Sequence, residues 1–139
     1  MNGYLLDTNV VSELRKPRPH GGVVAWLNHQ EEEQLFLSAV TMGELQVGIE
    51  RTRRHRPSKA SEIEFWADQL AGSYQILAMD TLCLLEWGRI MERKPDKLLE
   101  DAMIAATARV HHLIVATRNE ADFRQLDVRI LNPFKDQLV

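Results

Sequence analysis

Five short apolar segments, each bounded by polar or turn-forming residues, are separated by stretches with the spacing of helices. Their lengths of three to six residues suit strands rather than helices. Strands that alternate with helices along a chain are typical of an α/β fold with a mostly parallel sheet. The sequence therefore predicts a central five-stranded sheet flanked by helices. The expected strands cover residues 4–6, 35–40, 76–79, 113–116 and 128–131.

Two of the predicted helices matter for the argument about function. Apolar residues at helical spacing predict a helix over 82–91, with Leu82, Leu85 and Ile90 on its buried side. A second helix is expected over 101–111, and four alanines make it rich in small side chains. Small side chains allow this helix to lie close against its neighbours.

Composition limits the classes of protein to which the chain can belong. Its 139 residues fit one domain, 1–139, and 45% hydrophobic with 27% charged residues is ordinary for a folded protein. A single cysteine, Cys83, excludes an internal disulfide and a cysteine-based metal cluster. No stretch approaches the ~20 apolar residues of a membrane-spanning helix, and the first seven residues lack the pattern of a secretory signal. We therefore expect a cytoplasmic protein without a membrane partner.

Basic residues form two runs that contain no acid, one over 15–18 and one over 51–59. The net charge of −3, from 17 basic and 20 acidic side chains, argues against a protein that coats nucleic acid through bulk charge. It is compatible with an enzyme that grips a short stretch of nucleic acid locally. A solvated surface or helix end explains each run equally well. The positions considered for contact with nucleic acid are Arg15, Lys16, Arg51, Arg53 and Arg54.

Four carboxylates lie where strands end or helices begin. Asp7 directly follows the first strand, and Glu44 lies in the first turn of a helix expected to begin at Thr41. Asp101 opens the alanine-rich helix, and Asp122 follows the fourth strand by a short turn. The carboxyl ends of parallel strands share one edge, where open α/β sheets bind their ligands. We therefore expect the four side chains to converge there, provided that the helix of Asp101 starts at the same edge.

Clustered carboxylates point to a divalent metal, because like charges in one cleft are costly without a cation. Mg²⁺ is a hard ion that prefers oxygen ligands and keeps several waters. Once bound, it can activate water and polarise a phosphoryl oxygen. A site built only of carboxylates therefore favours phosphodiester hydrolysis over peptide hydrolysis, and the His-Glu-x-x-His pattern of zinc proteases is absent.

Three of the acids also have a purely structural explanation. Glu44 completes a capping box with the residue that starts its helix. Asp101 suits a helix N-terminus through the macrodipole, and Asp122 lies three residues after Asn119, which can itself cap a short helix. Asp7 has no such explanation, because an acid that closes a buried apolar strand gains nothing obvious there.

Seven blocks of the sequence, in order along nearly the whole chain, match one protein family. They are LLDTNVVSEL (5–14), LSAVTMGEL (37–45), GIE (48–50), EWG (86–88), DAMIAATA (101–108), TRNEADF (117–123) and VRILNPF (128–134). With these blocks the chain resembles the PIN-domain nucleases, and among them the VapC/FitB-like toxins of bacterial type II toxin–antitoxin pairs. A lone Asp-Thr-Asn is weak evidence, whereas all the blocks together are highly specific.

The resemblance implies a three-layer PIN-like domain with an Mg²⁺ site, open to Mn²⁺ as a substitute, formed by the four acids. Asp7 and Asp101 would bind the metal directly, whereas Glu44 and Asp122 would act through water or position the attacking water. Glu100, beside Asp101, leaves open which of the two faces the metal. Single-stranded or looped RNA, a second copy of the chain and an antitoxin that blocks the site are the implied partners. The polar positions expected to line the site are Thr8, Asn9, Thr117 and Asn119.

Two other functions are compatible with the sequence. A phosphoaspartate phosphatase would use Asp7 as its covalent acceptor. However, position 9 is Asn where such enzymes have a second Asp, and a lysine near a later strand end is missing. A non-catalytic PIN-like module would keep the fold for binding or regulation, although the presence of all four acids gives no sign of a dead site.

Overall fold

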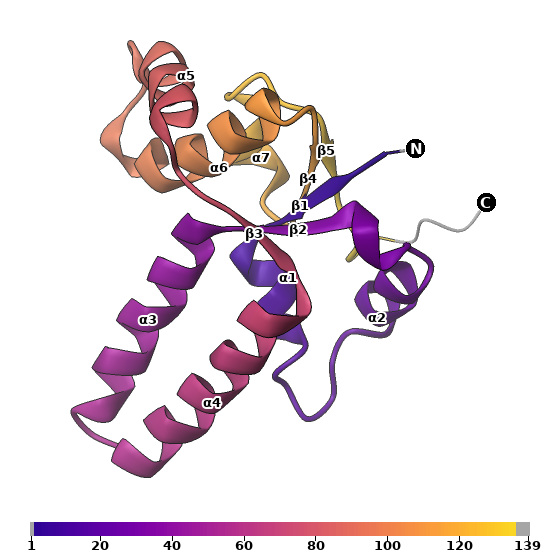
Figure 1. Ribbon diagram of the computed structural model, residues 1–139, viewed down its shortest axis with the longest axis vertical. Helices are drawn as coiled ribbons and strands as arrows, with labels where there is room; N and C mark the ends of the chain where they lie inside the picture. The colour runs from indigo at the N-terminus through magenta and orange to yellow at the C-terminus, as the bar shows by residue number, and fades with distance from the viewer. Residues whose placement is uncertain (1, 136–139) are drawn as a thin grey trace.

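A five-stranded sheet organises the computed structural model, which describes residues 2–135 (Figure 1). The strands lie in the order β3-β2-β1-β4-β5, and each neighbouring pair is parallel. The predicted α/β class and five-stranded sheet are confirmed, with the strands shorter than expected. The strands are β1 (Tyr4–Leu6), β2 (Leu35–Ser38), β3 (Gln75–Leu77), β4 (Ile114–Ala116) and β5 (Ile130–Leu131).

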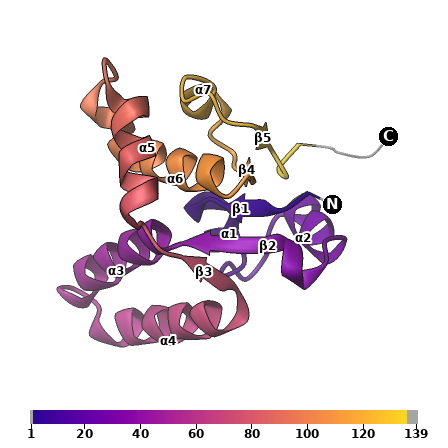
Figure 2. The same cartoon turned by 45° about the horizontal axis from the view of Figure 1, so that its top comes forward.

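Helices connect the strands and cover both faces of the sheet (Figure 2). Short 3₁₀ turns, Glu32–Gln34 and Asp96–Leu98, precede β2 and α6. Over residues 2–135, no helix combines the length and the apolar character needed to cross a membrane. The helices are α1 (Thr8–Glu13), α2 (Gly21–Asn28), α3 (Ala39–Arg53), α4 (Pro57–Ser73), α5 (Thr81–Met91), α6 (Leu99–Val110) and α7 (Glu120–Arg124).

Alternate residues of each strand enter two separate cores, because successive side chains of a strand point to opposite faces. Leu5 and Val115 pack with α5, α6 and α7 on one face. Tyr4 and Leu6 pack with α1, α2 and α4 on the other. Figure 2 shows these three layers, with the α3–α4 pair on the opposite side of the sheet from α5, α6 and α7. The alanines of α6 are fully buried, as their small size led us to expect.

The centre of the sheet brings several chain segments to one edge. β1 pairs with β2 on one side and with β4 on the other. In this register Leu6 stands opposite both Leu37 and Ala116. The next residues along these strands therefore emerge side by side at the carboxyl edge. In open parallel sheets the point where the strand order reverses is where ligands bind, and here that point lies beside β1.

Two helices begin where the sequence pattern did not place them. α3 starts at Ala39, directly after β2, because Ser38, the last residue of that strand, caps the helix: its hydroxyl accepts a hydrogen bond from Val40 N at 3.0 Å. The capping box expected from Thr41 to Glu44 is therefore wrong, since Thr41 lies buried within the first turn. The second is α1, a helix that the sequence pattern did not predict: the Asp7 side chain caps it, which gives this acid the structural role that the sequence did not suggest.

The buried side of α5 also differs from the prediction. Leu82 and Leu85 are 64% and 53% exposed, whereas Ile90 is buried as expected and Cys83 is buried beside it. The Asp80 carboxylate caps α5 by accepting from Cys83 N at 3.0 Å, and Cys83 and Ile90, two turns apart, share the covered face. The leucines therefore form a separate apolar surface.

Candidate active site

Asp7 lies at the centre of the carboxyl edge and is only 5% exposed. Its backbone N–H donates to Ala116 O at 2.9 Å, which continues the β1–β4 pairing past the end of the strand. Its carboxylate Oδ1 accepts from Thr8 N at 2.8 Å, and Oδ2 accepts from Thr117 Oγ1 at 2.7 Å and Asn9 Nδ2 at 3.1 Å. One acid therefore joins the ends of two strands to the start of α1.

The polar residues predicted to line the site fix its backbone. Asn9 Oδ1 accepts from Arg118 N at 3.1 Å, which ties α1 to the loop after β4. Thr117 Oγ1 accepts from Asn119 N at 2.9 Å while it donates to Asp7. Because each hydroxyl or amide uses both donor and acceptor capacity, the loop is held in one arrangement.

Asn119 links two of the predicted acids. Its side-chain Nδ2 donates to Asp101 Oδ2 at 3.2 Å and to Asp122 Oδ2 at 3.0 Å. Asn119 occupies the N-cap position of α7 but makes no side-chain capping bond there. Its amide is thus committed to the two carboxylates, and Asp101 and Asp122 face each other across it.

Glu44 joins the same edge from the second turn of α3. Its Oε1 accepts a hydrogen bond from Thr8 Oγ1 at 2.9 Å, and Thr8 also approaches Thr41 Oγ1 at 3.3 Å. Since the helix begins earlier than expected, the capping explanation for Glu44 is removed. The carboxylate is instead oriented by the residue that follows Asp7 in the chain.

Burial and mutual repulsion raise the pKa values of these acids. Burial, followed by the charges of Asp7 and Glu100, raises the pKa of Glu44 to about 7. Burial, and then the charges of Asp7, Asp122 and Glu100, raises the pKa of Asp101 to about 6. Burial also raises the pKa of Asp7 and outweighs its three hydrogen bonds. The acids therefore lie close enough to feel one another's charge.

The ion pairs formed within residues 2–135 involve none of these acids. Among those same residues, no three His, Cys, Asp or Glu side chains are gathered closely enough to enclose a metal ion. The carboxylates are held as neighbours by hydroxyl and amide donors. Such an arrangement fits hydrated Mg²⁺, which binds through one or two carboxylates and retains several waters. The donor chemistry is also right, since every acid offers hard oxygen ligands.

Comparison with known proteins identifies the family. A family model described as the PIN domain matches residues 4–129, most of the chain. The chain belongs to the PIN domain family. Its similarity to "Toxin FitB" of Neisseria gonorrhoeae is 32% identity over 95% of this chain and 99% of that protein. "VapC ribonuclease Y4jK" of Sinorhizobium fredii is also 32% identical, over 94% of this chain and 97% of its own length.

Solved structures agree with this PIN-domain assignment. The crystal structure of FitAcB from Neisseria gonorrhoeae contains a chain that superposes with a TM-score of 0.82 at 34% identity. The match covers 94% of the present chain and 98% of that one. The resemblance deduced from the sequence blocks is therefore confirmed for the family and the fold.

Glu100 is the member of this PIN-domain site that sequence reasoning left unresolved. The structure places it beside Glu44, whereas its neighbour Asp101 faces Asp122 through Asn119. Both adjacent acids of α6 thus contribute to the acidic edge. The sequence feature that could have predicted this is the position of both acids in the first turn of one helix. Consecutive side chains of a helix point in different directions, so the two acids reach different parts of the same edge.

The basic residues predicted to contact nucleic acid do not join the acids. Lys16 pairs with Glu13 at 2.9 Å, and Arg15 is exposed after α1. Arg53 pairs with two glutamates, and Arg51 and Arg54 are exposed where α3 ends. Any contact of these side chains with a substrate must therefore be made at a distance from the acidic edge.

Proposed function

We propose that this PIN domain is an Mg²⁺-dependent endoribonuclease that cuts single-stranded or looped RNA as the toxin of a toxin–antitoxin pair. The observation that carries the proposal is that five carboxylates without an ion-pair partner gather at the carboxyl edge of the sheet, where the strand order reverses. The names of the relatives, a toxin and a VapC ribonuclease, support the same activity. A non-catalytic binding module does not account for so many repelling charges at one edge.

In this proposal Asp7 and Asp101 hold the metal, with Mn²⁺ as a substitute. When bound, the ion supplies an activated water and stabilises charge on the phosphoryl oxygens. Glu44 and Asp122 orient the attacking water or hold metal-bound waters. Thr8 aims the Glu44 carboxylate through its 2.9 Å bond, and Thr117 keeps Asp7 in place.

The hydrogen bonds of Asp7 also bear on the phosphatase alternative. Both carboxylate oxygens accept hydrogen bonds from within the fold. A carboxylate held in this way is a weaker nucleophile than a free one, since its lone pairs are engaged. The geometry therefore favours a role in orientation and metal binding over covalent attack by Asp7.

Metal removal is expected to abolish RNA cleavage. Purified protein incubated with single-stranded RNA and Mg²⁺ should release shorter fragments, and EDTA should stop the reaction until excess Mg²⁺ is restored. Gel electrophoresis of labelled RNA measures both steps. Cleavage that persists in EDTA, or that is absent with Mg²⁺ and Mn²⁺ on every RNA tested, would count against the proposal.

We also propose that the toxin forms a homodimer through α5 and that an antitoxin is its partner. Leu82, Leu84 and Leu85 expose 64%, 46% and 53% of their surface on one short helix. Contiguous apolar surface of this kind is typical of protein–protein contact rather than of a solvated helix. A second copy of the chain would cover these leucines with its own.

Charge introduced at this surface should separate the two copies. The double variant Leu82→Glu/Leu85→Glu is expected to bring the molar mass in solution down to the 16.0 kDa of one chain. Multi-angle light scattering after size exclusion makes the measurement. Phe65→Glu on α4 is the matched control, because Phe65 is equally exposed at 65% but lies on a different helix. A monomeric wild type, or a double variant that stays dimeric, contradicts the assignment.

A further inference from the structure

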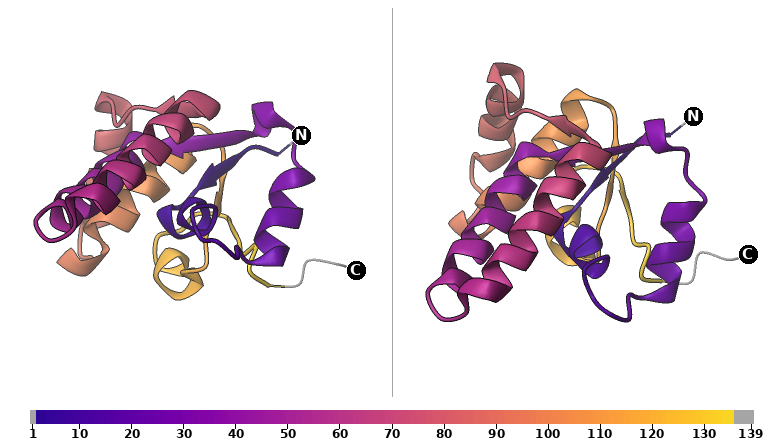
Figure 3. Two further views of the ribbon diagram at one scale, coloured as in Figure 1. Left: turned by 90° about the horizontal axis from the view of Figure 1, so that it is seen from below. Right: turned by 60° about the horizontal axis from the view of Figure 1, so that its bottom comes forward.

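The α3–α4 hairpin carries a cationic tip that the proposed chemistry does not use. α3 and α4 run side by side away from the sheet and turn at their far end (Figures 1 and 3). Residues 51–59 at this turn contain five of the chain's 17 lysines and arginines and no acid. We call this segment the basic tip. On a chain of net charge −3 it is a local concentration of positive charge.

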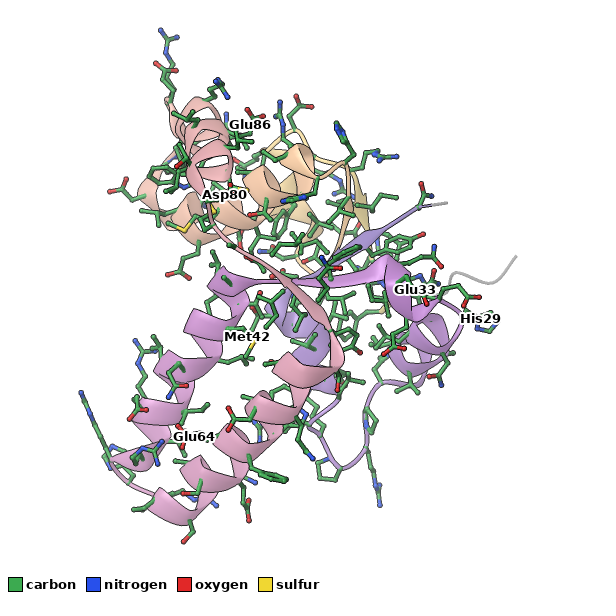
Figure 4. All side chains as sticks on the ribbon, in the orientation of Figure 1. His29, Glu33, Met42, Glu64, Asp80 and Glu86 are labelled. Atoms are coloured by element: carbon green, nitrogen blue, oxygen red, sulfur yellow. The ribbon has the colours of Figure 1, made fainter. Side chains whose placement is uncertain are left out.

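Some of these basic side chains form ion pairs with glutamates of the hairpin itself. Arg53 pairs with Glu50 at 3.2 Å and with Glu64 at 3.0 Å, and Glu64 lies on α4 beside α3 in Figure 4. Lys59 pairs with Glu62 at 3.4 Å. Of these pairs, Arg53–Glu64 joins α3 to α4, so Arg53 is a structural residue rather than a free cation.

The remaining arginines of the basic tip point their charge at solvent. Arg51, Arg54 and Arg56 are exposed. Within the part of the chain that the structure describes, none of the three takes part in an ion pair or a side-chain hydrogen bond. Three guanidinium groups within six residues therefore face solvent without a compensating acid.

The start of α4 adds to this positive field. Arg56 occupies its N-cap position without a side-chain capping bond, so the first N–H groups of a 17-residue helix lack a side-chain acceptor. A surface hollow of about 420 Å³ lies against them, lined by Arg56, Pro57, Ser58, Lys59 and Glu62. Guanidinium groups beside a concave helix start form a suitable contact for phosphate oxygens.

We infer that the basic tip binds the backbone phosphates of the RNA strand that is cut at the acidic edge. The inference rests on the proposed function and adds the surface that retains the substrate. Five carboxylates at the cleavage site repel a polyanion, so the affinity must come from cations elsewhere. Glu44 and Arg54 are ten residues apart along α3, which is a rise of about 15 Å. The tip therefore contacts phosphates about 15 Å or more from the scissile one.

Charge reversal at the tip tests the inference without relying on cleavage. Fluorescence anisotropy in EDTA measures the affinity of the full chain for a labelled 16-nucleotide single-stranded RNA, and a gel checks that the RNA stays intact. Arg54→Glu/Arg56→Glu should raise Kd about tenfold or more at 50 mM salt and reduce the salt slope by about 1.4, at ~0.7 per lost phosphate contact. Arg93→Glu/Arg129→Glu is the matched control, since both of these arginines are also exposed and lie outside the two basic runs, and should change Kd less than threefold.

The possible outcomes separate this inference from the proposed function. Unchanged RNA affinity in the tip variant, or an equal loss in the control, overturns the inference even if the enzyme cleaves RNA. The inference also fails if the tip variant loses affinity only for an acidic protein and not for RNA. RNA binding that depends on the tip in a protein that never cleaves RNA overturns the proposed function alone.

Discussion

Asp7→Asn should lower the rate of RNA cleavage by roughly 10³-fold or more while the chain folds as before. The substitution removes one negative charge from the centre of the acidic edge and with it the oxygen pair expected to bind the metal. The remaining amide oxygen can still accept from Thr8 N and cap α1. Loss of activity would therefore come from the chemistry of the site rather than from an unfolded α1.

The control and the stability measurement make this prediction specific. Asp68→Asn removes an exposed acid from α4 and should leave cleavage unchanged. In EDTA at pH 8 the melting temperature of Asp7→Asn should be no lower than that of the wild type, because relief of repulsion offsets the weaker hydrogen bonds. A fully active Asp7→Asn enzyme with an intact fold would remove Asp7 from the site.

The positions of the acids could be predicted because a parallel sheet places all its strand ends at one edge. Asp7 is one residue after a buried strand, so its location followed from the strand alone. Glu44 followed from the next strand, even though the predicted helix start was wrong by two residues. An error in the boundary of a helix leaves the edge unchanged, because the strand determines where the helix must begin.

The covered face of α5 could not be predicted in the same way. Leu82, Leu85 and Ile90 were expected on one stripe, but Ile90 lies two turns after Cys83 and shares the covered face with it. Periodicity identifies a helix but does not tell which of two apolar stripes meets the core. Here two leucines lie on the exposed stripe, consistent with a surface that binds a partner rather than the core.

The family resemblance implied that Asn119 lines the site, but the residues that it contacts could not be predicted from the local sequence. Locally, an Asn before a short helix is best explained as its cap. Only the packing of α6 against the loop after β4 brings Asp101 within 3.2 Å of the Asn119 amide. Contacts between segments distant in sequence are set by tertiary packing, which no local pattern encodes.

Without metal, the protein should be most stable at mildly acidic pH. The folded state raises the pKa of Glu44 from 4.5 to about 7 and that of Asp101 from 3.8 to about 6. Between the unfolded and folded pKa values, the folded chain binds more protons than the unfolded chain, so the free energy of unfolding falls as pH rises. In EDTA, the melting temperature should decline by several degrees from pH 5 to pH 8 through these groups.

Mg²⁺ should reverse this trend, because ions and protons compete for the same carboxylates. The rise in melting temperature on adding Mg²⁺ should be larger at pH 8 than at pH 6, and the cleavage rate should increase across that interval. Glu44→Gln should flatten the decline seen in EDTA, whereas Glu33→Gln, which alters an exposed acid far from the edge in Figure 4, should not. Scanning calorimetry at matched ionic strength measures each case. If the metal-free wild type instead became more stable from pH 6 to pH 8, the folded state would not raise the pKa values of these acids, and the prediction would be wrong.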